Sequence, residues 1–95
     1  MMTKSDEKIL KLLQTTIQGE ISSCEYSIMH AQEASTCINF KNDKWVVSHY
    51  ERAIDRPIGT FDNLIDAACA FLENVLPGER WRENREWFEQ EVKKI

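Results

Sequence analysis

The sequence predicts an α+β domain with an N-terminal helix, a three-stranded antiparallel sheet, and two C-terminal helices packed on one face of that sheet. Apolar residues recur at spacings of three and four near both ends of the chain, whereas β-branched and aromatic residues gather in its middle. The chain has 95 residues, 42% of them hydrophobic, which is enough for one hydrophobic core. We therefore expect residues 1–95 to form a single domain.

The first helix is expected from about Asp6 to Gln18. Its stripe of core-facing residues comprises Ile9, Leu12, Leu13, Thr16 and Ile17. Ser5 is the expected N-cap, because a serine hydroxyl readily accepts a hydrogen bond from an amide of the first turn. Gly19 is expected to end the helix in the left-handed conformation.

The next segment, residues 20–34, fits two interpretations. A helix is supported by the spacing of Ile21, Cys24, Ile28 and Ala31. A strand is supported by the alternation of Cys24, Tyr26, Ile28 and His30. A strand over roughly Cys24 to His30 is favoured, because the hairpin that follows is marginal on its own and gains from a third strand. Whether the segment is strand or helix stays open at this point.

Two β-prone runs, Thr36–Phe40 and Trp45–Arg52, flank the polar loop 41–44 and predict a hairpin. Antiparallel pairing across the loop places Phe40 opposite Trp45, Ile38 opposite Val47 and Thr36 opposite His49. That face is expected to lie on the core. The other face is expected to meet solvent or a partner, and it carries Cys37, Asn39, Val46, Ser48, Tyr50 and Arg52.

A loop is expected from Ala53 to Thr60, because Pro57 lacks a donor and Gly59 is flexible. Thr60 is the expected cap of a second helix, whose apolar stripe runs from Phe61 to Leu76. Pro77 and Gly78 end that helix, and the last helix is expected from about Glu79 to Lys94.

The charge balance limits the classes of partner. The chain has 12 Lys and Arg against 16 Asp and Glu, a net charge of −4. Nucleic-acid binding requires a basic surface, so we expect a basic protein partner and no nucleic acid. No apolar run approaches the length of a membrane span, and the first residues do not resemble a signal peptide. We therefore expect a cytoplasmic protein without a membrane partner, whose oligomeric state stays open.

Metal binding and cofactor chemistry are not expected. The soft ligands of the chain are Cys24, His30, Cys37, His49 and Cys69. Their spacings contain no paired ligand motif of the kind that zinc sites use. Three separated cysteines also argue against a disulfide framework, and we expect free thiols, with Cys69 packed in the core.

One set of residues supports an enzymatic alternative. His49, Glu51 and Arg56 supply the acid, base and phosphate-neutralising groups of a ribonuclease-like site. His49 and Glu51 share a strand face, but that face is expected to lie on the core, and Arg56 is expected in a loop. Cys37 and His49 are expected on opposite faces of the hairpin, which argues against a thiol nucleophile.

Acidic residues offer a candidate binding surface. Asp62, Asp66 and Glu73 recur at spacings of four and seven on the outer side of the second helix. They are the expected charged contacts for a basic partner. Tyr50 and Trp87 are the candidate aromatic anchors, because exposed aromatic residues often dominate interfaces.

Three segments resemble a pattern of small bacterial immunity proteins from polymorphic or contact-dependent growth-inhibition toxin systems. In that pattern an NDKW or NGKW hairpin turn leads to a YER strand end, and a helix beginning F-x-N/S-x-x-x-A follows. The corresponding segments here are 38–47 (INFKNDKWVV), 50–52 (YER) and 61–69 (FDNLIDAAC). Ala53 stands where many such sequences have glycine, and the similarity covers about residues 36–72, less than half of the chain.

The resemblance implies a non-catalytic cytoplasmic protein that binds and neutralises a cognate toxin domain, expected to be a basic nuclease. Complementary charge is compatible with this function, since an acidic protein associates faster with a basic one. The alternatives are a small nucleic-acid-processing enzyme using His49, Glu51 and Arg56, and a regulatory adaptor without a toxin.

Overall fold

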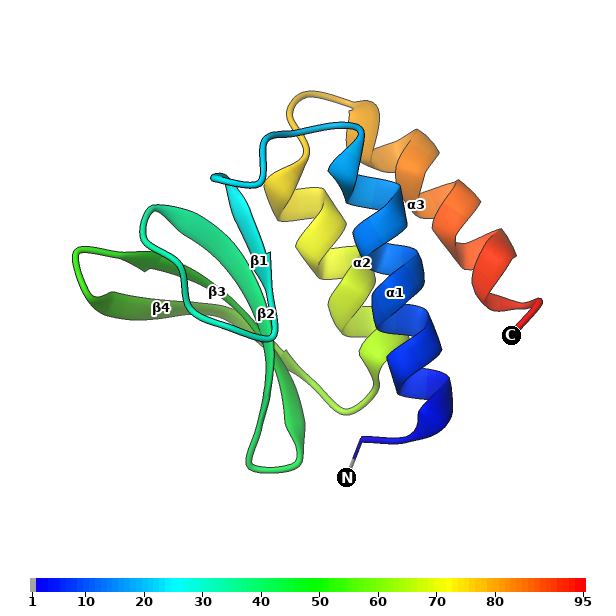
Figure 1. The fold of residues 1–95 in the computed structure, drawn as a ribbon, viewed down its shortest axis with the longest axis horizontal. Helices are drawn as coiled ribbons and strands as arrows, with labels where there is room; N and C mark the ends of the chain where they lie inside the picture. Colours follow the sequence, from blue (N-terminus) through cyan, green and yellow to red (C-terminus); the bar gives the residue numbers. More distant parts are fainter. Residues whose placement is uncertain (1) are drawn as a thin grey trace.

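The computed structural model describes residues 2–95 and confirms the α+β class. The elements are α1 (Lys4–Gln18), β1 (Tyr26–Ile28), β2 (Ser35–Lys41), β3 (Lys44–Glu51), β4 (Ile54–Phe61), α2 (Leu64–Val75) and α3 (Arg80–Val92). The three helices lie on one side of the sheet (Figure 1). Helix α2 contacts β2, β3 and β4, and α3 packs against α1 and α2. No helix within residues 2–95 has both the length and the apolar character needed to cross a membrane.

The sheet differs from the three-stranded antiparallel sheet predicted above. It has four strands in the order β1-β2-β3-β4, and β1 runs parallel to β2. The strand interpretation of residues 20–34 is thus right for Tyr26–Ile28 only. A parallel pair usually needs a long crossover, but β1 is only three residues long, so residues 29–34 suffice to return the chain. The Gln32 amide stabilises this connection by donating to the Ser23 carbonyl at 2.8 Å.

The fourth strand occupies most of the loop predicted at residues 53–60. Arg52 and Ala53 have φ values of 54° and 61°, which close a two-residue turn between β3 and β4. The Glu33 carboxylate accepts hydrogen bonds from the backbone N–H groups of both residues. Pro57 is tolerated because β4 is an edge strand and because Pro57 lies next to an irregularity in its pairing with β3.

The β2–β3 hairpin confirms the predicted register. Phe40 lies opposite Trp45, Ile38 opposite Val47 and Thr36 opposite His49. The turn residues 42 and 43 both have positive φ, as a tight two-residue hairpin turn requires.

The helix caps differ from those predicted. Thr3, not Ser5, caps α1, in a reciprocal capping box with Asp6. Gly19 follows α1 with a right-handed φ of −90°, so the expected left-handed end is wrong. Asn63, not Thr60, caps α2, because β4 continues to Phe61.

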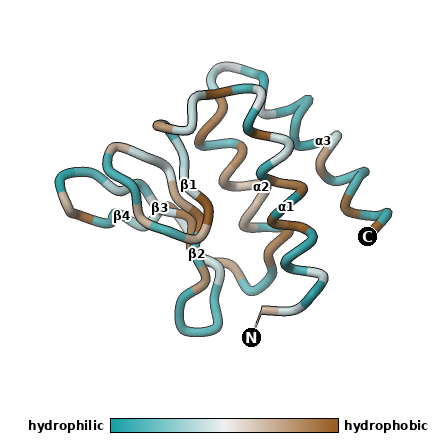
Figure 2. The backbone as a smooth tube through the Cα atoms, viewed as in Figure 1, coloured by the Kyte–Doolittle hydropathy of each residue, from teal (hydrophilic) through white to brown (hydrophobic). Residues whose placement is uncertain are grey.

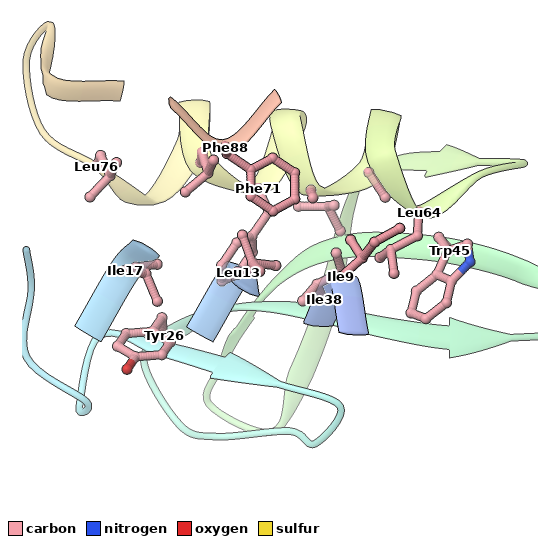
Figure 3. Close-up of a cluster of buried hydrophobic side chains, with 14 residues drawn as sticks. Ile9, Leu13, Ile17, Tyr26, Ile38, Trp45, Leu64, Phe71, Leu76 and Phe88 are labelled. Carbon is pink, nitrogen blue, oxygen red and sulfur yellow. The ribbon is translucent and has the colours of Figure 1, made fainter. Parts of the chain in front are cut away.

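The core lies between the sheet and the helices. Helix α1 contributes Ile9, Leu13 and Ile17, which face Tyr26 and Ile38 of the sheet (Figure 3). The buried residues of α2 are Leu64, Ala67, Ala68, Cys69, Phe71 and Leu72. Phe88 is the one residue of α3 that is fully buried among the described residues. Figure 2 accordingly shows hydrophobic stretches in α1 and α2, whereas α3 is largely hydrophilic.

Candidate partner-binding surface

The predicted acidic residues lie along the solvent side of α2. Asp66 and Glu73 are seven residues apart, so they share a helix face about 10 Å apart along the axis. Asp66 belongs to the first turn, where the Asn63 side chain caps its backbone N–H at 2.8 Å. Asp62 lies just before the helix, and its side chain is 82% exposed. The three carboxylates are therefore accessible to a partner.

A hollow of about 260 Å³ separates Asp66 from Glu73. It is lined by Phe61, Asp66, Cys69, Ala70, Glu73 and Arg85. The Phe61 ring packs over Gly59, where an added Cβ would lie 3.0 Å from two ring carbons. The hollow thus combines an apolar floor with charged ends.

Arg85 of α3 closes one end of this hollow. Its guanidinium contacts Glu73 at 2.7 Å and Glu89 at 3.0 Å, which joins α2 to α3. The hydrogen bond to Glu89 raises the pKa of Arg85, and the same bond lowers the pKa of Glu89. Both groups stay charged at neutral pH.

Cys69 lies on the floor of the hollow and is buried, as predicted. Its thiol donates a hydrogen bond to Glu89 at 3.3 Å. Burial and the neighbouring Glu89 carboxylate raise the pKa of Cys69 from 9.0 to about 11. The thiol is therefore neutral at physiological pH and is a poor nucleophile.

The hollow and its surroundings carry an excess of negative charge. Asp62 is paired with Lys44, and Arg85 is shared between Glu73 and Glu89. The Asp66 carboxylate accepts a hydrogen bond from the side-chain amide of Asn63 at 2.9 Å. It has no cationic partner among residues 2–95. The hollow itself is lined by two carboxylates, Asp66 and Glu73, and by one guanidinium, that of Arg85, which leaves an excess of one negative charge.

The two predicted aromatic anchors lie away from this surface. Tyr50 points to the sheet face opposite the helices, because residues alternate along β3 and Trp45 and Val47 face the core. Trp87 is 42% exposed on α3. It lies about 200° around the helix from Glu89, which faces α2. The structure thus brings Asp66 and Glu73 to one hollow, leaves Asp62 beside the start of α2 in an ion pair with Lys44, and separates both aromatic residues from the hollow.

The residues of the enzymatic alternative do come together. His49 Nε2 lies 3.8 Å from Glu51 Oε2, and Arg56 is the cross-strand neighbour of His49. The expectation that this face lies on the core is wrong at His49, whose side chain is 40% exposed. The reason is visible in Figure 1, where the end of the β3–β4 hairpin extends beyond the helices. Arg56 lies on a strand rather than in a loop, since β4 includes it.

The soft metal ligands remain dispersed. Cys24 is exposed, whereas Cys37 and Cys69 are buried in different parts of the fold. Within residues 2–95, no group of three or more His, Cys, Asp and Glu side chains is arranged to hold a metal ion.

Sequence reasoning missed Arg85 and Glu89 as parts of this surface. Their spacing of four on one helix marks them as a pair, but it does not reveal that they pack against Glu73 and Cys69. Comparisons of the chain with protein-family models, with curated proteins and with solved structures found no match.

Proposed function

We propose that this chain is a cytoplasmic immunity protein, which neutralises a cognate bacterial toxin domain by direct protein contact and without catalysis. Two observations support the proposal. The segment of residues 36–72 resembles immunity proteins of growth-inhibition systems, and the chain has a net charge of −4.

The observation that carries the proposal is the exposed acidic surface along α2. Asp66 and Glu73 lie on α2 and line a hollow with an excess of negative charge, and Asp62 lies just before the Asn63 cap of the same helix. Nuclease domains bind a polyanion and are therefore commonly basic near their substrate site. An acidic surface of this kind accelerates association with such a domain and disfavours acidic competitors.

The proposal can be tested with a toxin domain encoded next to this chain. Coexpression of that domain with the tagged chain should yield a complex that copurifies, and the chain should rescue growth when the toxin is expressed. Asp62→Lys with Asp66→Lys should slow association by about tenfold or more, since the steering field reverses sign.

A matched control is available on α3. Glu79 is the N-cap residue of α3 and Glu83 lies in its first turn, and both are exposed. Glu79→Lys with Glu83→Lys therefore changes the net charge by the same amount at an equivalent helix position. Equal loss of binding in the two double variants would contradict a role for the α2 surface, and failure of the domain to copurify would contradict the proposal itself.

A second candidate function rests on the proximity of His49, Glu51 and Arg56. A histidine beside a carboxylate, with a guanidinium opposite, has the groups that cleave a phosphodiester through proton transfer. Incubation of the purified chain with labelled RNA and DNA tests this alternative directly. Specific cleavage that His49→Ala abolishes would overturn the proposal of a binding protein.

A further inference from the structure

The hollow between Asp66 and Glu73 has one end that holds a cation and one end that does not. We infer that the free end receives an arginine side chain of the partner protein. This inference rests on the proposed function and specifies which chemical group the α2 surface recognises.

The first step of the argument is the chemistry that the structure already uses at the occupied end. There the guanidinium of Arg85 lies 2.7 Å from Glu73 and 3.0 Å from Glu89. The rim of the hollow therefore binds a guanidinium supplied by a neighbouring helix. Asp66, at the other end, faces the same hollow with only the neutral amide of Asn63 as a partner.

The second step is the shape of the hollow. Phe61 and Ala70 supply an apolar floor, against which the methylene stem of an arginine can pack. The flat guanidinium can lie over the Phe61 ring, an arrangement that cationic groups favour. Gly59 leaves room for that ring, since an added Cβ would press on it at 3.0 Å.

The third step is the charge balance. An arriving arginine would balance the excess of one negative charge in the lining of the hollow, so the charges of site and ligand are complementary. The neutral thiol of Cys69 adds no further charge to the floor. The site therefore favours a cation with an apolar stem over an anion or a small metal ion.

The experiment titrates ¹⁵N-labelled protein with N-acetyl-arginine methylamide and follows the backbone amides by NMR. The neutral isostere N-acetyl-citrulline methylamide serves as the control ligand. Arginine should shift the amide signals of residues that line the hollow. Asp66→Asn should weaken this binding by about threefold to fivefold, which is the value of a half-exposed ion pair.

Two further variants distinguish the hollow from general charge effects. Ala70→Leu fills the hollow and should abolish the localised shifts, whereas Gln90→Leu adds the same side chain on the exposed side of α3 and should not. Thermal unfolding of each variant confirms that it is folded. Equal shifts with arginine and citrulline, or shifts that persist in Ala70→Leu, would overturn the inference.

The same variants separate this inference from the proposed function. If a toxin domain copurifies with the native chain and equally with Ala70→Leu, the arginine site is wrong and the immunity function stands. If no toxin domain copurifies but arginine binds at the hollow, the immunity function is wrong instead.

Discussion

Lys41 Nζ lies 3.0 Å from Asp55 Oδ2, in an ion pair that joins the end of β2 to the beginning of β4. Alternation along the strands places both side chains on the sheet face that the helices leave uncovered. Lys41 lies next to the β2–β3 turn, whereas Asp55 lies next to the β3–β4 turn. The sheet must curl to bring them together, and Figure 1 shows the two turns pointing in different directions.

The stability contributed by Asp55 should depend on pH. Its pKa is lowered by the nearby Ser48 hydroxyl, although Ser48 Oγ makes no hydrogen bond within residues 2–95, and by the ion pair with Lys41 at 3.0 Å, whereas desolvation opposes the shift. A carboxyl whose pKa is lower in the folded state stabilises the fold above the pKa of the unfolded state, about 3.9, and loses this contribution as the pH falls through the folded pKa. Urea unfolding between about pH 2 and pH 7 measures this effect. The free energy of unfolding of the native chain should exceed that of Asp55→Asn at neutral pH, and the difference should disappear at the acidic end.

The size of this effect is modest, up to about 1 kcal/mol, because both partners are exposed to solvent. An NMR titration of Asp55 in Ser48→Ala supplies the control, and its pKa should rise towards the ordinary value. An unchanged pKa in Ser48→Ala would contradict the assigned cause.

The turn at Arg52 and Ala53 should be stabilised by glycine. Ala53 has a φ of 61°, a conformation that costs a residue with a Cβ about 1–2 kcal/mol. Part of the gain is lost because glycine is more flexible in the unfolded chain, so Ala53→Gly should raise the free energy of unfolding by about 0.5–1 kcal/mol. Denaturant unfolding measures the difference.

Glu33 provides the complementary test of this turn. Glu33→Ala removes the acceptor of both turn N–H groups, so the amides of residues 52 and 53 should exchange faster with solvent. Glu25→Ala, at an exposed position without such a contact, should leave their exchange unchanged. For the other variant, Ala53→Gly, a decrease in the free energy of unfolding would contradict the conformational strain assigned to the positive φ of Ala53.

The thiols of Cys24 and Cys69 should react at very different rates. Cys24 is exposed and should be alkylated by iodoacetamide at neutral pH, whereas Cys69 is buried with a pKa of about 11 and should be protected. The pKa of Cys69 is higher in the folded chain than its ordinary value of 9.0. The contribution of Cys69 to the free energy of unfolding is therefore complete below pH 9.0 and declines as the pH rises towards 11. Mass spectrometry after timed alkylation resolves each site.

Glu89→Gln is the matched variant for Cys69. Removal of the carboxylate charge should lower the pKa of the thiol and speed its alkylation at alkaline pH. Alkylation of Cys69 in the native chain as fast as that of Cys24 would contradict the buried hydrogen-bonded placement.

Helix α3 should depend on a single buried ring. Phe88 is fully buried, whereas the adjacent Trp87 is exposed. Phe88→Ala should cost about 3–5 kcal/mol through the lost burial and the cavity left behind. Trp87→Ala should cost about 0.5 kcal/mol or less, as expected for a surface position. Denaturant unfolding of the two variants compares them, and similar losses would mean that the faces of α3 are assigned wrongly.

The sequence alone determined the features that depend on near neighbours in the chain. Helical spacing identified the stripe of α1 and placed Asp66 and Glu73 on one face of α2. Alternation on either side of the polar loop 41–44 determined the pairing of Ile38 with Val47, because antiparallel strands keep facing residues in register. These signals are local, so composition and period reveal them.

Features that depend on partners distant in the chain follow from the three-dimensional packing. The turn at Arg52 and Ala53 lacks a glycine, and it is held by Glu33 from a different loop, so β4 could not be recognised from its own residues. The parallel pairing of β1 follows from a short return stabilised by Gln32. The hollow itself exists because α3 brings Arg85 to Glu73. An amphipathic pattern indicates which face of a helix is buried, but it does not indicate which residues of another helix that face will contact.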